Sequence, residues 1–131
     1  MKTLLTSIIL SLISISAFSQ SAMPEKIFQA MLDSTNSIDV VFYNEEGASI
    51  SADGKDVSFF NFFFSKDAAT KTKARAGGSV MWLINGREFL SGTFYLADST
   101  GYLVTKKNDK EYVNKITPTG FNFLNGGYKR R

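Results

Sequence analysis

The sequence predicts an α+β domain in which an N-terminal helix packs on a curved antiparallel β-sheet or open roll of six to eight strands. Three observations support this fold class: one segment with helical spacing near the start, short β-branched and aromatic segments after it, and turn residues between those segments. No helical pattern separates the later strands, so a parallel sheet, which needs long crossover connections, is excluded. A small closed β-barrel is the alternative architecture.

The first 19 residues have the three parts of a secretory signal peptide. Lys2 supplies the positive charge, residues 4–18 are uncharged, and Ala17 and Ser19 place small residues before a cut at Gln20. The uncharged stretch is 15 residues long, which is shorter than the roughly 20 residues of a membrane-spanning helix. An uncleaved N-terminal anchor is the alternative. We expect a periplasmic or secreted protein with no transmembrane segment after cleavage.

The rest of the chain has the length of one domain. Residues 20–125 are predicted to form a single β-rich domain with an N-terminal helix, and residues 126–131 a basic, frayed tail. The chain has no Cys, so it can form no disulfide, and its stability must come from burial. Twelve Phe, five Tyr and one Trp suit that purpose because aromatic side chains bury large apolar areas.

The predicted helix covers residues 24–36 and precedes the strands. Pro24 suits a first helical turn, and apolar residues then recur at helical spacing at Ile27, Phe28, Met31 and Leu32. After the helix the pattern favours strands, with residues 56–64 as the most hydrophobic one. The predicted strands are residues 38–43, 48–52, 56–64, 79–84, 87–96, 102–106, 112–116 and 121–124.

Turn residues separate these strands. Asp53-Gly54 and Asn85-Gly86 are the strongest hairpin signals, because both residue types tolerate the positive φ of a tight hairpin turn. Residues 44–47, 98–101, 108–109 and 118–120 predict further turns. Residues 65–78 are predicted to form a long polar connection.

The central strands are apolar on both faces, which predicts either a cavity or a second packed layer. In a sheet with one solvent-exposed face, apolar and polar residues alternate along each strand, and these strands lack that alternation. Because one short helix offers little cover, we expect an apolar or amphipathic ligand on one of the faces. A filled core is the alternative. The expected ligand-binding residues are Phe59, Asn61, Phe63, Met81, Leu83, Phe89, Thr93 and Tyr95.

Charge is divided unevenly along the chain. Residues 22–60 carry a net charge of −5 and residues 61–131 a net charge of +7. Acidic strands facing basic ones would explain this division. The alternative is a surface that attracts anionic head groups, for which Lys71, Lys73 and Arg75 are the candidate residues. Nucleic acid is not an expected partner of an exported protein.

The chain contains neither His nor Cys, which excludes thiol nucleophiles, Ser-His triads and the usual zinc sites. We expect no enzymatic activity, no cofactor and no metal. The expected function is that of an exported small binding protein that holds an apolar or amphipathic ligand between helix and sheet. The alternative is a protein–protein interaction module, such as an inhibitor or envelope-assembly factor, acting through a sheet edge or an aromatic patch.

Overall fold

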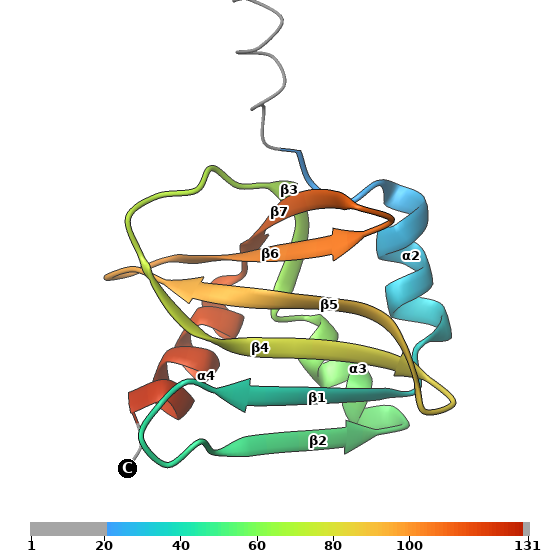
Figure 1. Cartoon of the computed structure of the whole chain (residues 1–131), viewed down its shortest axis with the longest axis horizontal. Coiled ribbons are helices and arrows are strands. Elements are labelled where there is room, and N and C mark those ends of the chain that lie inside the picture. The colour runs from blue at the N-terminus through green and yellow to red at the C-terminus, as the bar shows by residue number, and fades with distance from the viewer. Residues whose placement is uncertain (1–20, 130–131) are drawn as a thin grey trace, which may run out of the picture.

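The computed structural model describes residues 21–129, which form a seven-stranded sheet with three helices (Figure 1). The predicted signal peptide, residues 1–19, lies outside the described residues. The helices are α2 (Glu25–Ser34), α3 (Lys55–Asn61) and α4 (Pro118–Lys129). The strands are β1 (Ser37–Phe42), β2 (Ser49–Asp53), β3 (Phe64–Ala68), β4 (Arg75–Ile84), β5 (Arg87–Leu96), β6 (Gly101–Lys107) and β7 (Lys110–Ile116).

The sheet is open and antiparallel throughout. Its strand order is β2-β1-β4-β5-β6-β7-β3, so β2 and β3 are its two edges. The mixed α/β character and the predicted number of strands are confirmed, whereas the closed-barrel alternative is wrong. A helix lies at the predicted place near the N-terminus, but the helices in closest contact with the strands are α3 and the C-terminal α4. The prediction of an N-terminal helix as the only cover was therefore wrong.

The predicted strand over residues 56–64 is instead a helix followed by the start of an edge strand. Gly54 has φ 58°, and at this residue the chain leaves β2 and enters α3, so the Asp53-Gly54 hairpin prediction was wrong. Within α3 the buried residues are Val57, Phe60 and Asn61, which share one helical face. The helical spacing was not recognisable in the sequence because residues 59–64 are five Phe and one Asn. A mostly apolar run of this kind fits a buried strand as well as a helix.

The predicted strand over residues 121–124 is also helical, as is residue range 126–129 of the predicted frayed tail. Pro118 suits the first position of α4, and Thr117 Oγ1 accepts a hydrogen bond from the Gly120 N–H at 3.0 Å. Phe121 and Leu124 are buried one helical turn apart. Two glycines allow close approach: a Cβ at Gly120 would lie 2.4 Å from the Phe63 carbonyl oxygen, and one at Gly127 2.4 Å from the Phe42 ring.

Two tight turns in the meander from β4 to β7 have the predicted form. Asn85 and Gly86 have φ values of 51° and 81°, and Asn108 and Asp109 have values of 53° and 64°. Positive φ at both central residues matches the twist of the flanking strands. These turns fix the register of the central strands.

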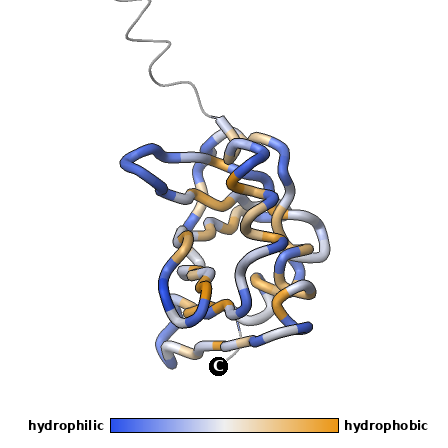
Figure 2. Tube along the Cα trace, turned by 90° about the vertical axis from the view of Figure 1, so that its right-hand side faces the viewer, coloured by the Kyte–Doolittle hydropathy of each residue, from blue (hydrophilic) through white to orange (hydrophobic). Residues whose placement is uncertain are grey.

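The core lies between the sheet and the helices, where the hydrophobic segments gather while hydrophilic ones form outer loops (Figure 2). Trp82, Phe63 and Phe94 are the largest fully buried side chains. The Trp82 Nε1–H donates a hydrogen bond to Asn61 Oδ1 at 2.9 Å, which satisfies both polar groups in the core. The space between helix and sheet is thus occupied by the protein's own side chains.

Candidate ligand-binding groove

The structure divides the eight predicted ligand-binding residues between three environments. Phe59, Asn61 and Phe63 belong to α3 and the turn after it, on the helical side of the sheet. Met81, Leu83, Thr93 and Tyr95 are half-buried and alternate along β4 and β5 with residues of the core. They therefore lie on the other face of the sheet. The eight residues do not form one site.

Phe89 has an environment of its own because of an irregularity in strand pairing. Trp82 pairs with Leu90 whereas the next residue, Leu83, pairs with Glu88, so Phe89 is an extra residue in β5. The Phe89 ring packs against the core, and the Lys107 ammonium lies 4.1 Å from its centroid. This bulge reverses the face that simple alternation assigned to Phe89.

The sheet face away from the helices carries a shallow hollow of about 550 Å³. Its lining contains both apolar and polar side chains, among them the oppositely charged Lys106 and Glu111. Tyr95, at one side, stacks on Tyr102 with ring centroids 5.1 Å apart. Of the predicted ligand-binding residues, Met81, Thr93 and Tyr95 line this hollow.

A more apolar groove of about 440 Å³ lies between α2 and α3. Its lining comes from α2, from α3, from the start of β3 and from the residue before α4. Asn61 is the one predicted ligand-binding residue in it. The groove residues are Phe28, Leu32, Ser58, Asn61, Phe62, Phe64, Lys66 and Thr117.

Phe62 is the most unusual side chain of this groove, because it is 75% exposed although it is a large apolar residue. Its backbone is held in place: Thr117 Oγ1 donates to the Phe62 carbonyl at 2.9 Å, and the Thr117 N–H donates to the Phe63 carbonyl at 2.9 Å. Leu32, across the groove, is 37% exposed. The fold thus fixes an aromatic side chain in solvent beside an apolar groove.

Aromatic residues adjacent to Phe62 in the sequence form a connected cluster with Phe123. Phe59, which is 50% exposed, has its ring edge-on to Phe60, Phe63 and Phe123 at centroid distances of 5.4, 5.1 and 5.8 Å. Phe63 is fully buried beneath it. Sequence reasoning named Phe59 and Phe63 but missed Phe62, because a strand assignment placed Phe62 on the core face. The available signal was that five Phe among residues 59–64 exceed what one buried face accommodates.

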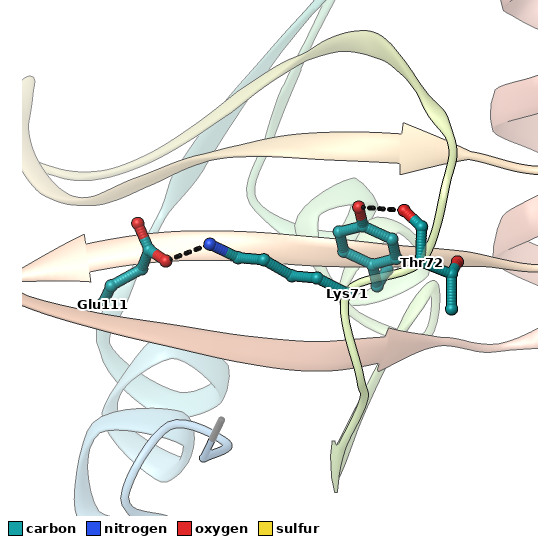
Figure 3. A network of polar contacts seen from close by, with 4 residues as sticks. Lys71, Thr72 and Glu111 are labelled. Atoms are coloured by element: carbon teal, nitrogen blue, oxygen red, sulfur yellow. Dashed lines mark hydrogen bonds and ion pairs between the residues drawn. The ribbon is translucent and has the colours of Figure 1, made fainter. Parts of the chain in front are cut away.

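The three predicted anion-binding residues are also separated. Lys71 belongs to the strap, which we define as residues 69–74 joining β3 to β4 across the sheet face away from the helices (Figure 1). Its ammonium forms an ion pair with Glu111 of β7 (Figure 3). Lys73 and Arg75 lie beyond this contact and line a different cleft. Lys71, Lys73 and Arg75 therefore do not form one patch.

Tyr102 of β6 fastens the strap to the sheet and should make stability sensitive to high pH. Its hydroxyl donates to the Thr72 carbonyl at 3.0 Å. Burial raises the pKa of this phenol above its ordinary value, and the neighbouring Tyr95 adds to the rise. A raised pKa means that the folded chain keeps a proton that the unfolded chain releases, so this stability is complete below the unfolded pKa and is lost as pH rises toward the folded one.

We expect the stability of the wild type to fall more steeply than that of Tyr102→Phe between about pH 9 and about pH 12, around the ordinary tyrosine pKa. Urea midpoints across this range measure the difference. Tyr112→Phe, on the neighbouring strand β7, is the matched control. Parallel curves for the wild type and Tyr102→Phe would contradict the assignment.

Comparison with protein-family models, curated proteins and solved structures found no significant match. Within residues 21–129, no three His, Cys, Asp or Glu side chains gather closely enough to hold a metal ion. None of the helices in this range is long and apolar enough to cross a membrane.

Proposed function

We propose that this chain is an exported, non-enzymatic binding protein that holds an amphipathic ligand in the groove between α2 and α3. The observation that carries the proposal is Phe62, an apolar side chain left 75% exposed by a backbone that hydrogen bonds hold in place. Exposure of this kind leaves a large unfavourable contact with water, which a ligand would remove.

The groove lining indicates the chemistry of the ligand. Phe28, Leu32 and Phe62 offer an apolar surface for a hydrocarbon chain. Lys66 is the only charged residue among the lining side chains, and Thr117 and Ser58 add hydroxyl groups. An apolar chain that ends in an anionic head group matches this combination of one cation and several apolar walls. A long-chain fatty acid has this chemistry.

Titration with a fluorescent long-chain fatty acid tests the proposal. We expect saturable binding by the wild type and a loss of about tenfold in affinity in Phe62→Ser, since the variant lacks the phenyl ring whose burial by the ligand contributes on the order of 1.5 kcal/mol. Tyr43→Ser is the matched control, because Tyr43 is 49% exposed and lies outside the groove. Equal losses in both variants, or no binding by the wild type, would contradict the proposal.

Lys66→Gln separates head-group recognition from binding of the chain. We expect this variant to bind the fatty acid more weakly while its affinity for the fatty alcohol of the same length stays unchanged. The thermal midpoints of Phe62→Ser and Lys66→Gln control for folding. They should stay close to that of the wild type because Phe62 and Lys66 are both exposed.

A protein partner is the second candidate, and the joint exposure of Phe59 and Phe62 favours it. The two rings are 50% and 75% exposed and belong to the same turn of the chain, so they offer an aromatic anchor of the kind that concentrates binding energy at interfaces. Phe59 does not line the groove. A Phe59→Ser variant that retains full fatty-acid affinity but loses a partner captured by the wild type would favour this second function.

A further inference from the structure

A second cleft, distant in sequence from the groove, lies where the strap enters β4. Its volume is about 560 Å³, which is within the range of small-molecule sites. Its walls come from the start of β4, the end of β5 with the turn that follows, and the last turns of α4. The lining residues are Lys73, Ala74, Arg75, Leu96, Ala97, Asp98, Asn125, Tyr128 and Lys129.

Three cations converge on this cleft and one carboxylate opposes them. Lys73, Arg75 and Lys129 are exposed, and the sole ion pair found in residues 21–129 is the one between Lys71 and Glu111. None of the three cations is therefore paired with Asp98 or with any other described carboxylate. The lining carries a net charge of +2. Glu45 and Glu46 line an adjoining cleft together with Arg75, Tyr128 and Lys129, but neither carboxylate forms an ion pair with these cations.

Packing sets the position of one of these cations. The Arg75 guanidinium lies over the Tyr128 ring, 5.8 Å from its centroid, and this contact favours one orientation of the guanidinium fork. Arginine presents several N–H donors in a plane, which suits the oxygens of a phosphate group. The Asn125 side chain adds a neutral donor and acceptor in the same lining.

We propose that this cleft binds the phosphate group of an organic phosphate. A doubly charged phosphate would neutralise the excess of two positive charges, and the guanidinium and two ammonium groups would donate to its oxygens. Asp98 would accept a hydrogen bond from a hydroxyl group next to the phosphate, which favours a phosphorylated polyol over an inorganic ion. The same chemistry is offered by a soluble polyol phosphate and by a phosphoglycerol lipid head group.

Calorimetric titration of the purified protein with glycerol 3-phosphate at low salt tests the soluble form. The decisive variant is the triple substitution Lys73→Gln, Arg75→Gln and Lys129→Gln. The matched control is Lys26→Gln, Lys55→Gln and Lys110→Gln, which removes the same charge from exposed positions outside the cleft. We expect the cleft variant to bind at least about tenfold more weakly, as the loss of several charge-assisted hydrogen bonds requires, and the control to keep wild-type affinity.

Co-sedimentation with phosphatidylglycerol vesicles distinguishes the source of the phosphate. Binding to vesicles alone, lost in the cleft variant and kept in the control, assigns the cleft to lipid head groups, whereas binding to glycerol 3-phosphate alone assigns it to a soluble ligand. Equal losses in both triple variants, or no binding of either probe by the wild type, would overturn the proposal. Phe62→Ser should leave the binding of glycerol 3-phosphate unchanged, because this probe has no hydrocarbon chain and Phe62 lies outside the cleft. The calorimetric test is therefore independent of the fatty-acid groove.

Discussion

Gly78→Ala should destabilise the protein by about 3 kcal/mol, at the upper end of the usual effect of overpacking, and lower its thermal midpoint by roughly 10–20 °C. A Cβ at this position would lie 2.1 Å from the Val41 carbonyl oxygen and 2.6 Å from Cζ of Phe94. Val41 belongs to β1, which pairs directly with β4, so the carbonyl cannot move without breaking the ladder. Relief at Phe94 is limited as well, because that ring is fully buried.

Gly126→Ala is the matched control for this substitution. Gly126 lies in α4, and a Cβ there would meet no atom within 4 Å. Because alanine favours the helix over glycine, we expect a gain of about 0.5–1 kcal/mol. Thermal unfolding followed by circular dichroism measures both changes. A Gly78→Ala protein as stable as the wild type would show that β1 and β4 do not approach as closely as described.

Asn114→Leu should cost about 2–4 kcal/mol, because it removes two hydrogen bonds of one buried side chain. Asn114 of β7 is fully buried. Its Oδ1 accepts from the Met23 N–H at 3.0 Å, and its Nδ2 donates to the Ser65 carbonyl at 2.9 Å. Leucine fills a similar volume but leaves the Met23 donor and the Ser65 acceptor without partners. Urea unfolding followed by the fluorescence of Trp82, the only Trp of the chain, measures the loss.

Two further variants define the role of Asn114. Asn122→Leu, at an exposed position of α4, should change stability by less than about 0.5 kcal/mol. Asn114→Asp keeps an acceptor for Met23, but burial raises the pKa of the new carboxyl. The free energy of unfolding of the aspartate variant should therefore be closest to that of the wild type below about pH 4. It should fall further below the wild-type value as pH rises toward neutrality. An Asn114→Asp deficit that does not vary with pH would contradict this description.

The sequence predicted best where local chemistry decides the structure. Asn85-Gly86 and Asn108-Asp109 adopt the positive φ values that their residue types favour, and the strands beside them follow. The helix at Glu25–Ser34 shows an apolar spacing that only a helix satisfies. In these segments propensity, spacing and tertiary contacts all favour the same structure, which is why sequence alone was enough.

Prediction failed where an apolar run satisfies two structures at once. The run from Val57 to Phe64 is hydrophobic enough for a buried strand, and only contacts with the sheet select the helix with Val57 and Phe60 on its buried face. Phe121 and Leu124 present the same ambiguity in α4. Both errors arose because tertiary packing, and not local propensity, decides between strand and helix for short apolar segments.

The errors in secondary structure also explain why the predicted site residues differ from those that line the clefts of the structure. The predicted face of Met81, Leu83, Thr93 and Tyr95 exists, but it carries only a shallow hollow. The strap is attached to this face through Tyr102 and Glu111, and sequence spacing could not place it. Phe62 lies in the groove because α3 ends at Asn61, an end point that the predicted strand over residues 56–64 did not contain. Lys129 joins Lys73 and Arg75 because α4 returns the chain to the start of β4, a long-range contact without a local signal.

The strand order has a consequence for how the chain folds. The four strands from β4 to β7 are neighbours in sequence and in space, so short loops can bring them together early. Both flanks of this meander are then covered by one earlier segment, with β1 beside β4 and β3 beside β7. Until that segment closes around it, two long strands expose unpaired backbone groups that another molecule could extend. Docking of residues 37–68 replaces these two edges with the shorter strands β2 and β3, of five residues each, and so lowers the exposure of the chain to aggregation.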